Sequence, residues 1–140
     1  NTGNISRTCA ATGAYLHLVR PLGFSTDDAQ LKRAGLDYWE HLHIEYHDSF
    51  QELQRKYTDA RFFFSTTKGE HLYSDITFQD GDFFVFGKET KGLPEELLAE
   101  NSERCIRIPM GKVIRSLNLS NSAAVVLYEG LRQIGYPDLV

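Results

Sequence analysis

The chain has 140 residues, of which 41% are hydrophobic and 24% charged, and its formal net charge is −4. These proportions exclude the disordered and fibrous classes and predict one globular domain over residues 1–140. The negative charge excludes the protein-wide positive field that drives unspecific binding to nucleic acid. A nucleic-acid partner would therefore have to meet a local basic patch.

The two cysteines, Cys9 and Cys105, are far apart in the sequence and lack the CxxC spacing of a metal site. We expect reduced thiols in a cytoplasmic protein. No run approaches the roughly 18 consecutive apolar residues of a membrane span, and no signal-peptide pattern occurs, so no membrane partner is expected. The chain opens on NTGN without an initiator Met, which predicts that a preceding segment is missing.

The first half of the chain alternates between helix and strand patterns. Asn4 is a candidate N-cap for the first helix, and Gly13 lies near its end, where a left-handed residue is often needed. Ser49 and Glu52 have capping-box spacing. In chain order, the predicted elements are a helix over 5–14, a strand over 15–19, a helix over 25–35, a strand over 42–46 and a helix over 48–57.

The second half continues this alternation with short apolar runs typical of strands buried on both faces of a sheet. The predicted elements are strands over 61–66, 82–87 and 104–110, a helix over 94–100 and a final helix over 120–134. Alternating strands and helices predict an α/β fold with a mostly parallel sheet and helices on both faces. Ligands of such folds bind beyond the carboxyl ends of the strands, which here means the loops 65–70, 87–94 and 109–122.

Several common chemistries are excluded or disfavoured by their missing motifs. The loop 87–94 lacks the Lys and Ser or Thr of a phosphate loop, and no GxGxxG or GxSxG occurs. His41, His43 and His47 lie close together, but no cysteine or well-placed carboxylate completes a tetrahedral set, so no metal is expected. The loop 87–94 is either a plain turn before a helix or part of a backbone-rich pocket, and both interpretations stay open here.

Two charged residues are candidates for ligand contacts. Arg7 lies one helical turn beyond NTGN, where side chains and backbone donors could converge on an anion, although a surface arginine is the alternative. Glu89 lies between the two glycines of its loop and is either an exposed acid or a partner for a ligand amine or a neighbouring arginine. In RSLNLSNSAAVVLYE (115–129), capping the final helix accounts for Asn118 or Ser120 but not for the other small polar residues.

Three blocks together resemble the SPOUT superfamily of knotted RNA methyltransferases, in its ribose 2′-O-methylating branch. These blocks are NTGNISRTC (1–9), FGKETKGLP (86–94) and IPMGKVIRSLNLSNSAAVVLYE (108–129). Within this branch, the chain is similar to enzymes that methylate the wobble cytidine or uridine of leucine tRNAs. The family also has a first strand before the NTGN block, which this chain lacks.

The resemblance implies an α/β fold with a C-terminal deep trefoil knot, a homodimer, a tRNA substrate, and S-adenosylmethionine as the cofactor, with S-adenosylhomocysteine as product. The motif positions imply three sets of site residues. The catalytic set is Asn1, Arg7, Glu89, Ser116 and Asn118, the cofactor set is Ser65, Thr66, Gly87, Ile108, Met110, Ser116 and Leu117, and the RNA contacts are Arg7, Arg115 and Tyr128.

In the implied reaction, a ribose 2′-oxygen attacks the methyl group of the cofactor in line. A guanidinium is hardly ever deprotonated, so we expect Arg7 to anchor the adjacent phosphate and to stabilise developing oxyanion charge. Ser116 and Asn118 would orient the ribose and the methionine end of the cofactor, leaving Ser120 or Asn121 to cap the helix. Two other hypotheses are a catalytically inactive RNA-binding dimer of the same fold and a small-molecule-binding α/β module unrelated to RNA.

Overall fold

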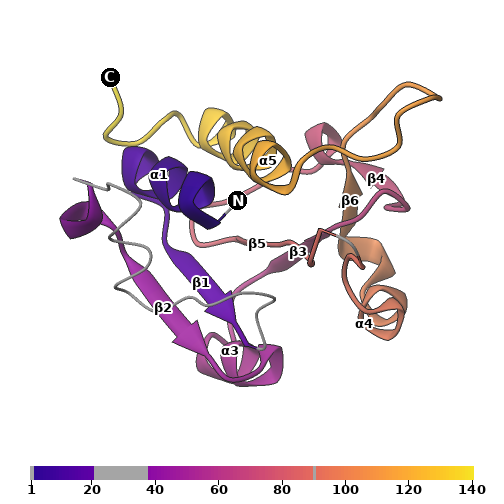
Figure 1. Ribbon diagram of the computed structural model, residues 1–140, viewed down its shortest axis with the longest axis horizontal. Coiled ribbons are helices and arrows are strands. Elements are labelled where there is room, and N and C mark those ends of the chain that lie inside the picture. The colour runs from indigo at the N-terminus through magenta and orange to yellow at the C-terminus, as the bar shows by residue number, and fades with distance from the viewer. Residues whose placement is uncertain (1, 21–37, 90) are drawn as a thin grey trace. The chain divides into compact units, whose positions relative to one another are not determined.

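The computed structural model describes residues 2–20, 38–89 and 91–140, and it divides into two compact units, residues 1–59 and 60–140. Both units combine helices with parallel strands (Figure 1). This confirms the predicted α/β class. Hydrogen bonds define one two-stranded and one four-stranded sheet among the described residues, whereas the sequence predicted a single sheet. Each unit is described below by itself.

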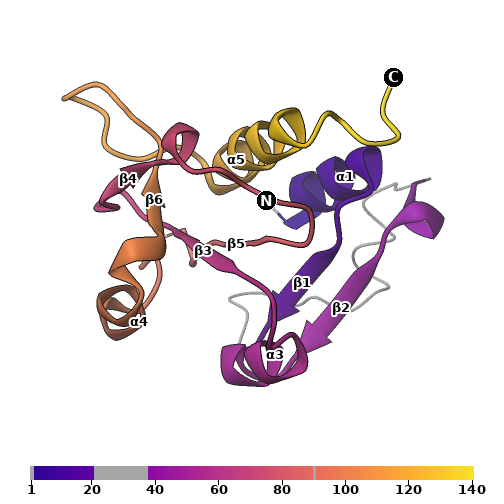
Figure 2. The same cartoon turned by 180° about the vertical axis from the view of Figure 1, so that it is seen from behind.

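The first unit is built around two parallel strands. Strand β1 (Leu16–Val19) lies beside and parallel to β2 (Ile44–His47) (Figure 2). In the register of this pair, Leu16 lies opposite Ile44. The other elements are helix α1 (Thr2–Thr12), the 3-10 turn η1 (Trp39–His41) and helix α3 (Phe50–Lys56). The predicted strands at 15–19 and 42–46 are thereby confirmed. The helix predicted over 25–35 lies outside the described residues.

Two helix termini in this unit follow the predicted local chemistry, and one departs from it. The hydroxyl oxygen of Ser49 accepts a hydrogen bond of 3.1 Å from the backbone N–H of Glu52, which confirms the predicted cap of α3. Helix α1 ends before Gly13, whose φ of +80° is the left-handed conformation expected there. However, α1 begins at Thr2, so the prediction that Asn4 caps it is wrong.

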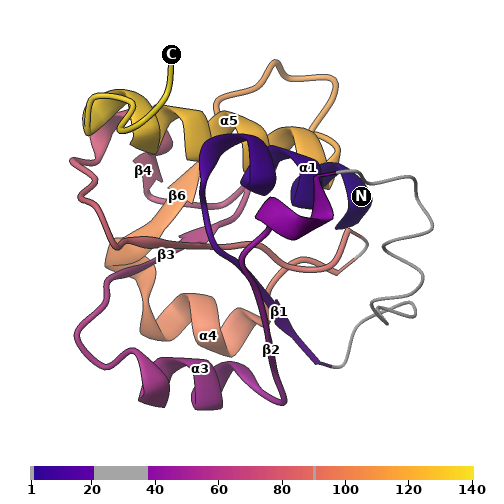
Figure 3. The same cartoon turned by 90° about the vertical axis from the view of Figure 1, so that its left-hand side faces the viewer.

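The second unit contains the four-stranded sheet, in which all neighbouring strands are parallel. Its order is β4-β6-β3-β5, and helices α4 and α5 lie on opposite sides of it (Figure 3). The elements are β3 (Phe62–Ser65), β4 (His71–Leu72), η2 (Tyr73–Asp75), β5 (Phe83–Val85), α4 (Glu95–Glu100), η3 (Ser102–Arg104), β6 (Cys105–Arg107) and α5 (Leu119–Gln133). Strand β4 is too short for a recognisable sequence pattern.

Strand alternation explains how both faces of this sheet are covered. Ile106 belongs to the buried cluster formed with Phe63, Phe78 and Val126 of α5. Its neighbour Cys105 points to the other face, where its thiol donates to the Leu98 carbonyl of α4 across 3.6 Å. Successive residues of β6 therefore pack against different helices. This is why the run predicted from RCIRIPM is apolar at consecutive positions.

Helix α5 packs closely on the sheet. A Cβ atom at Gly130 would lie 3.0 Å from the Phe84 ring, so the absence of a side chain at this position allows the approach. Gln133 joins α5 to the segment before β5, because its amide oxygen accepts from the Phe78 N–H at 2.7 Å and its amide nitrogen donates to the Ile76 carbonyl at 2.8 Å. Among the described residues, no helix is long and apolar enough to cross a bilayer.

Candidate functional site

The three predicted ligand loops follow strands that end at the same edge of the four-stranded sheet. Strands β3, β5 and β6 are adjacent and parallel, with Phe64 opposite both Val85 and Cys105. The segments that follow these strands therefore begin side by side at the carboxyl edge. Four of the cofactor residues inferred from the sequence lie at or just beyond this edge, namely Ser65, Thr66, Gly87 and Ile108. Because the strands are parallel, residues from distant motifs meet here.

The first of these loops is tied to β6 by backbone contacts. The Thr66 N–H donates to the Ile106 carbonyl at 2.9 Å, and the Thr66 hydroxyl accepts from the Lys68 N–H at 3.2 Å. Gly69 is buried, and a Cβ atom there would lie 2.6 Å from the Ile106 carbonyl carbon. Sequence reasoning missed Gly69. The glycine in STTKGE was the available signal, but the need for close approach depends on β6, which is distant in sequence.

The second loop is a tight turn that carries Glu89. Lys88 and Gly92 form an isolated antiparallel bridge, in which the Gly92 N–H donates to the Lys88 carbonyl at 2.8 Å. Gly92 has a φ of +66°, and a Cβ atom at Gly87 would collide with the backbone of Gly92 and Leu93. Both glycines are therefore required by the turn itself. Glu89 is exposed on it, as one of the two sequence interpretations expected.

The third loop joins β6 to α5 and is the most open of the three. Ile108 packs against the buried cluster around Ile106, and Met110 is half-buried. Residues 111–118, which include Arg115 and Ser116, are all exposed, and the side chain of Leu117 is 41% exposed. Within the described chain, residues 110–117 donate no backbone hydrogen bond to another backbone group. Their N–H groups are thus available to a ligand.

Asn118 caps helix α5, which corrects the expectation that Ser120 or Asn121 does so. Its side-chain oxygen accepts from the N–H groups of Ser120 at 2.9 Å and Asn121 at 3.4 Å, and from the Ser120 hydroxyl at 2.6 Å. Ser120 is 8% exposed and lies inside the helix, which begins at Leu119 rather than at Ser120. The capping interpretation of Asn118 is therefore confirmed. Tyr128 lies on α5 and is 44% exposed.

The remaining predicted residues belong to the first unit. Arg7 is exposed on α1, and its guanidinium carbon lies 5.8 Å from the centre of the Tyr38 ring, a cation–π distance. The Tyr38 hydroxyl in turn donates to the Gly3 carbonyl at 3.2 Å. Arg7 is thus oriented by an aromatic residue that follows it by about thirty positions. Asn1 lies outside the described residues.

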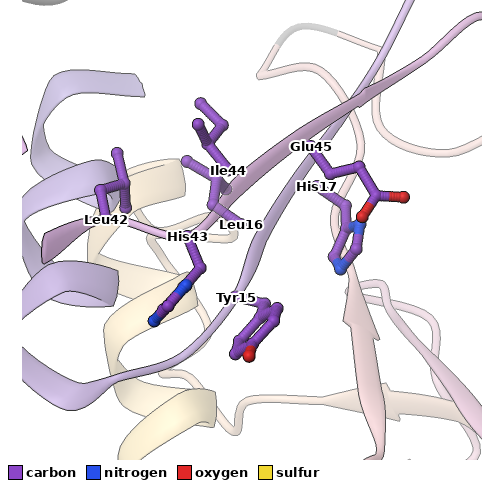
Figure 4. A pocket seen from close by; sticks show the side chains of 7 residues that line it. All are labelled: Tyr15, Leu16, His17, Leu42, His43, Ile44 and Glu45. Carbon is purple, nitrogen blue, oxygen red and sulfur yellow. The ribbon is translucent and has the colours of Figure 1, made fainter. Parts of the chain in front are cut away.

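The first unit also contains a cavity of about 320 Å³ between the starts of β1 and β2 (Figure 4). On one side of it, the rings of Tyr15 and His43 are stacked with their centres 4.5 Å apart. On the other side, the His17 ring and the Glu45 carboxylate lie next to each other. Sequence reasoning did not group these residues, because they lie in or just before two strands that are separated by more than twenty positions.

Burial raises the pKa of both thiols. The pKa of Cys9 rises to about 11, and that of Cys105 rises because of burial first and the charge of Glu70 second. Both cysteines are free, as expected from their spacing. Neither thiol is activated as a nucleophile, because activation requires a lowered pKa. The thiols are therefore structural residues of their cores.

Relatives from several bacteria match at least 95% of the chain. A Listeria innocua protein is 59% identical over 143 residues, spanning 100% of this chain and 85% of its own length. Relatives from Methylovorus glucosotrophus (55% identical; 95% of this chain, 87% of its own) and Escherichia coli K12 (48%; 100% and 90%) carry the name tRNA (cytidine(34)-2′-O)-methyltransferase.

Solved structures of RNA methyltransferases are also similar to this chain. A Bacillus anthracis protein has a TM-score of 0.92 at 55% identity, covering 99% of this chain and 89% of its own. A structure solved for insight into the 2-OH methylation of C/U34 on tRNA has a TM-score of 0.87 at 45% identity, covering 94% of this chain and 86% of its own. An AdoMet-bound rRNA methyltransferase of Sinorhizobium meliloti has a TM-score of 0.78 at 27% identity (94% and 51%).

The family model of the SpoU rRNA methylases matches residues 1–128. This range includes the first compact unit, most of the second, and all three motif blocks except the last residue of the third. Together with relatives that are about half identical over nearly the whole chain, this match confirms the resemblance inferred from the motifs. The chain belongs to the SpoU rRNA methylase family.

Proposed function

We propose that the chain methylates the ribose 2′-hydroxyl of nucleotide 34 of tRNA, a cytidine or uridine, with S-adenosylmethionine as the methyl donor. The observation that carries this proposal is the extent of identity to relatives named for this reaction, 55% and 48% over at least 95% of the chain. Leucine tRNAs as substrates, the homodimer and the deep knot are parts of the proposal that rest on the motif resemblance. A cytoplasmic location follows from a tRNA substrate.

In this proposal, residues 1–140 act as one methyltransferase domain, because the family model spans residues 1–128 without a break between the two units. The cofactor would be held at the carboxyl edge of β3, β5 and β6. Ser65, Thr66, Gly87, Ile108, Met110, Ser116 and Leu117 are the proposed contacts. Support comes from the backbone N–H groups of residues 110–117, which donate to no other backbone group within the described residues, and from the exposed apolar residue Leu117.

When bound, S-adenosylmethionine supplies a methyl group already activated by its sulfonium, so the protein must align it with the 2′-oxygen and stabilise charge. Arg7 can contribute a permanent positive charge, since its guanidinium stays protonated, and Tyr38 restricts its orientation. Arg7 therefore anchors the adjacent phosphate and stabilises negative charge that develops on the 2′-oxygen. The 2′-proton leaves to another acceptor.

Asn1, Glu89, Ser116 and Asn118 complete the proposed catalytic set, and Arg115 and Tyr128 the proposed tRNA contacts. Glu89 and Ser116 are exposed and can reach a bound substrate. Asn118 differs from them, because its side-chain oxygen already accepts hydrogen bonds from the start of α5. Only its amide nitrogen is left to contact the substrate, so Asn118 would act there as a hydrogen-bond donor.

The test compares Arg7→Ala with Arg55→Ala, a matched control because Arg55 is an exposed arginine of α3 in the same unit. Each protein is incubated with unmodified leucine tRNA and labelled S-adenosylmethionine, and the methylated nucleotide is mapped. We expect wild type and Arg55→Ala to label nucleotide 34, and Arg7→Ala to lose the activity while calorimetry still detects cofactor binding. Near-normal turnover by Arg7→Ala would refute its role. Retention of tRNA by wild type without any labelling would instead indicate a non-catalytic RNA-binding protein.

A further inference from the structure

Three potential metal ligands converge on one face of the two-stranded sheet. In the parallel register, His17 of β1 lies opposite Glu45 of β2, and Val19 lies opposite His47. Glu45 and His47 are two positions apart on the same strand, so their side chains share a face. His17 belongs to the neighbouring strand and projects to that face as well. The pairing of β1 with β2 therefore assembles two imidazoles and one carboxylate from positions 17, 45 and 47.

Two of the distances between the potential ligand atoms are close to those around a small tetrahedral ion. Nδ1 of His17 lies 3.0 Å from Nε2 of His47, and this Nε2 lies 3.3 Å from Oε1 of Glu45. Bonds of about 2.0–2.1 Å to a tetrahedral Zn²⁺ separate neighbouring ligand atoms by about 3.3–3.4 Å. All three ligand atoms lie within 4.8 Å of one another. Small side-chain movements therefore suffice to surround an ion.

The surrounding residues hold these side chains in place. His47 is 2% exposed, and its second ring nitrogen, Nδ1, lies 3.9 Å from a carboxylate oxygen of Glu52. A carboxylate next to the non-ligating nitrogen is the usual surrounding of a metal-bound histidine. The second oxygen of Glu45 accepts a hydrogen bond of 2.9 Å from the Tyr57 hydroxyl. The Tyr57 ring also meets His17 edge-on, with ring centres 5.4 Å apart.

Imidazole chemistry selects the class of ion. Two histidines and one carboxylate suit Zn²⁺ and similar transition metals, whereas Mg²⁺ and Ca²⁺ prefer oxygen ligands alone. Ligation requires neutral imidazole, so metal binding at this site would weaken as the pH falls. His17 and Glu45 also line the cavity of Figure 4, so a fourth ligand such as water has access.

One cation competes for the same carboxylate. Nζ of Lys56 lies 2.6 Å from Oε1 of Glu45, the oxygen that also faces His47. The Lys56 side chain is 57% exposed, so it can leave this position at little cost, because exposed ion pairs contribute little stability. Without an ion, His17 and His47 share a hydrogen bond instead. Lys56 is therefore expected to weaken metal binding without preventing it.

We propose that His17, Glu45 and His47 form a binding site for Zn²⁺ or a similar divalent transition metal, with the fourth position open to solvent. The site joins β1 to β2 and is independent of the proposed methyl transfer, which uses other residues. The sequence expectation of no metal considered His41, His43 and His47. It did not include His17, which is thirty positions before His47.

The test titrates Zn²⁺ into the full metal-free chain by calorimetry and Co²⁺ by visible absorption, which is intense for a tetrahedral ion. We expect one ion per chain. His17→Gln should weaken Zn²⁺ affinity by about 100-fold or more, since loss of a residue that only supports a ligand already costs about 10–100-fold. His41→Gln is the matched control, because His41 is an exposed histidine of the same unit outside the cluster, and its affinity should equal that of wild type.

Lys56→Gln gives a result of the opposite sign. Removing the competing Lys56 ammonium should tighten Zn²⁺ binding by about tenfold. The reason is that repulsion between a unit positive charge and a nearby dication weakens the affinity by about this factor even at the protein surface. Thermal unfolding of each metal-free variant establishes that it folds, and His17 is only half-buried, so its replacement tests ligation rather than folding. The proposal is refuted if wild type binds no Zn²⁺, or if His17→Gln and His41→Gln bind it equally.

Discussion

Asn118 offers a direct measurement of what the cap of α5 contributes to stability. Asn118→Ala removes the acceptor of two backbone N–H groups, and loss of such a cap typically costs about 1 kcal/mol. The Ser120 hydroxyl, on a residue only 8% exposed, also loses its 2.6 Å partner, which adds about 1 kcal/mol. We therefore expect the free energy of unfolding to fall by about 2 kcal/mol. With a urea m-value of about 2 kcal/mol/M, the midpoint moves down by about 1 M.

The matched variant is Asn118→Asp, which keeps a side-chain oxygen at the cap and adds a negative charge where the helix dipole favours one. Its urea midpoint should equal or exceed that of wild type. Methyl transfer by this variant then separates two roles, because a catalytic need for the amide nitrogen would abolish activity without lowering stability. An unchanged midpoint for Asn118→Ala would refute the capping energy, and an equal loss in Asn118→Asp would show that the oxygen is not the stabilising acceptor.

Two further predictions concern titrating groups. Burial raises the pKa of Cys9 to about 11 and also raises the pKa of Cys105. Both thiols should therefore react slowly with iodoacetamide at pH 8 in the folded protein and rapidly in urea. Fast labelling of the native chain would contradict this prediction. The hydrogen bond from Arg132, and secondarily that from Gln133, lowers the pKa of Glu129. A carboxyl group whose pKa is lowered by folding stabilises the protein above its unfolded pKa of about 4.3. This stabilisation is lost as the pH falls through the folded pKa. Arg132→Gln should therefore lower the urea midpoint at pH 6, and its midpoint should converge with that of wild type once the pH falls below the folded pKa of Glu129. A difference that stays constant as the pH falls would refute the linkage.

The strands and helices of the second unit were largely predictable because their signals are local. The runs around Phe63, Phe84 and Ile106 are apolar at consecutive positions, which is typical of strands covered on both faces, and all three are strands. Capping by Ser49 was predictable for the same reason, since the hydrogen bond spans three residues. The start of α1 was not predictable, because NTGN contains turn residues that nevertheless lie inside the helix from Thr2.

The three loops of the candidate cofactor site were predictable as a set. Parallel strands end at one edge of a sheet, so alternation of strands and helices was enough to group the loops after β3, β5 and β6. The need for glycine at positions 69 and 87 was not predictable, since it arises from backbone that approaches from β6 and from the far side of the turn. The role of Asn118 was open until the structure gave its hydrogen bonds.

The sequence by itself determined the α/β class, the family, and the residues at the carboxyl edge, because short-range periodicity and three motif blocks carry that information. Only the tertiary structure showed that β1 and β2 form a separate two-stranded sheet and that the side chains of His17, Glu45 and His47 meet on it. The physical reason is strand register. A ladder of backbone hydrogen bonds brings position 17 opposite position 45, and no pattern within either segment specifies that partner.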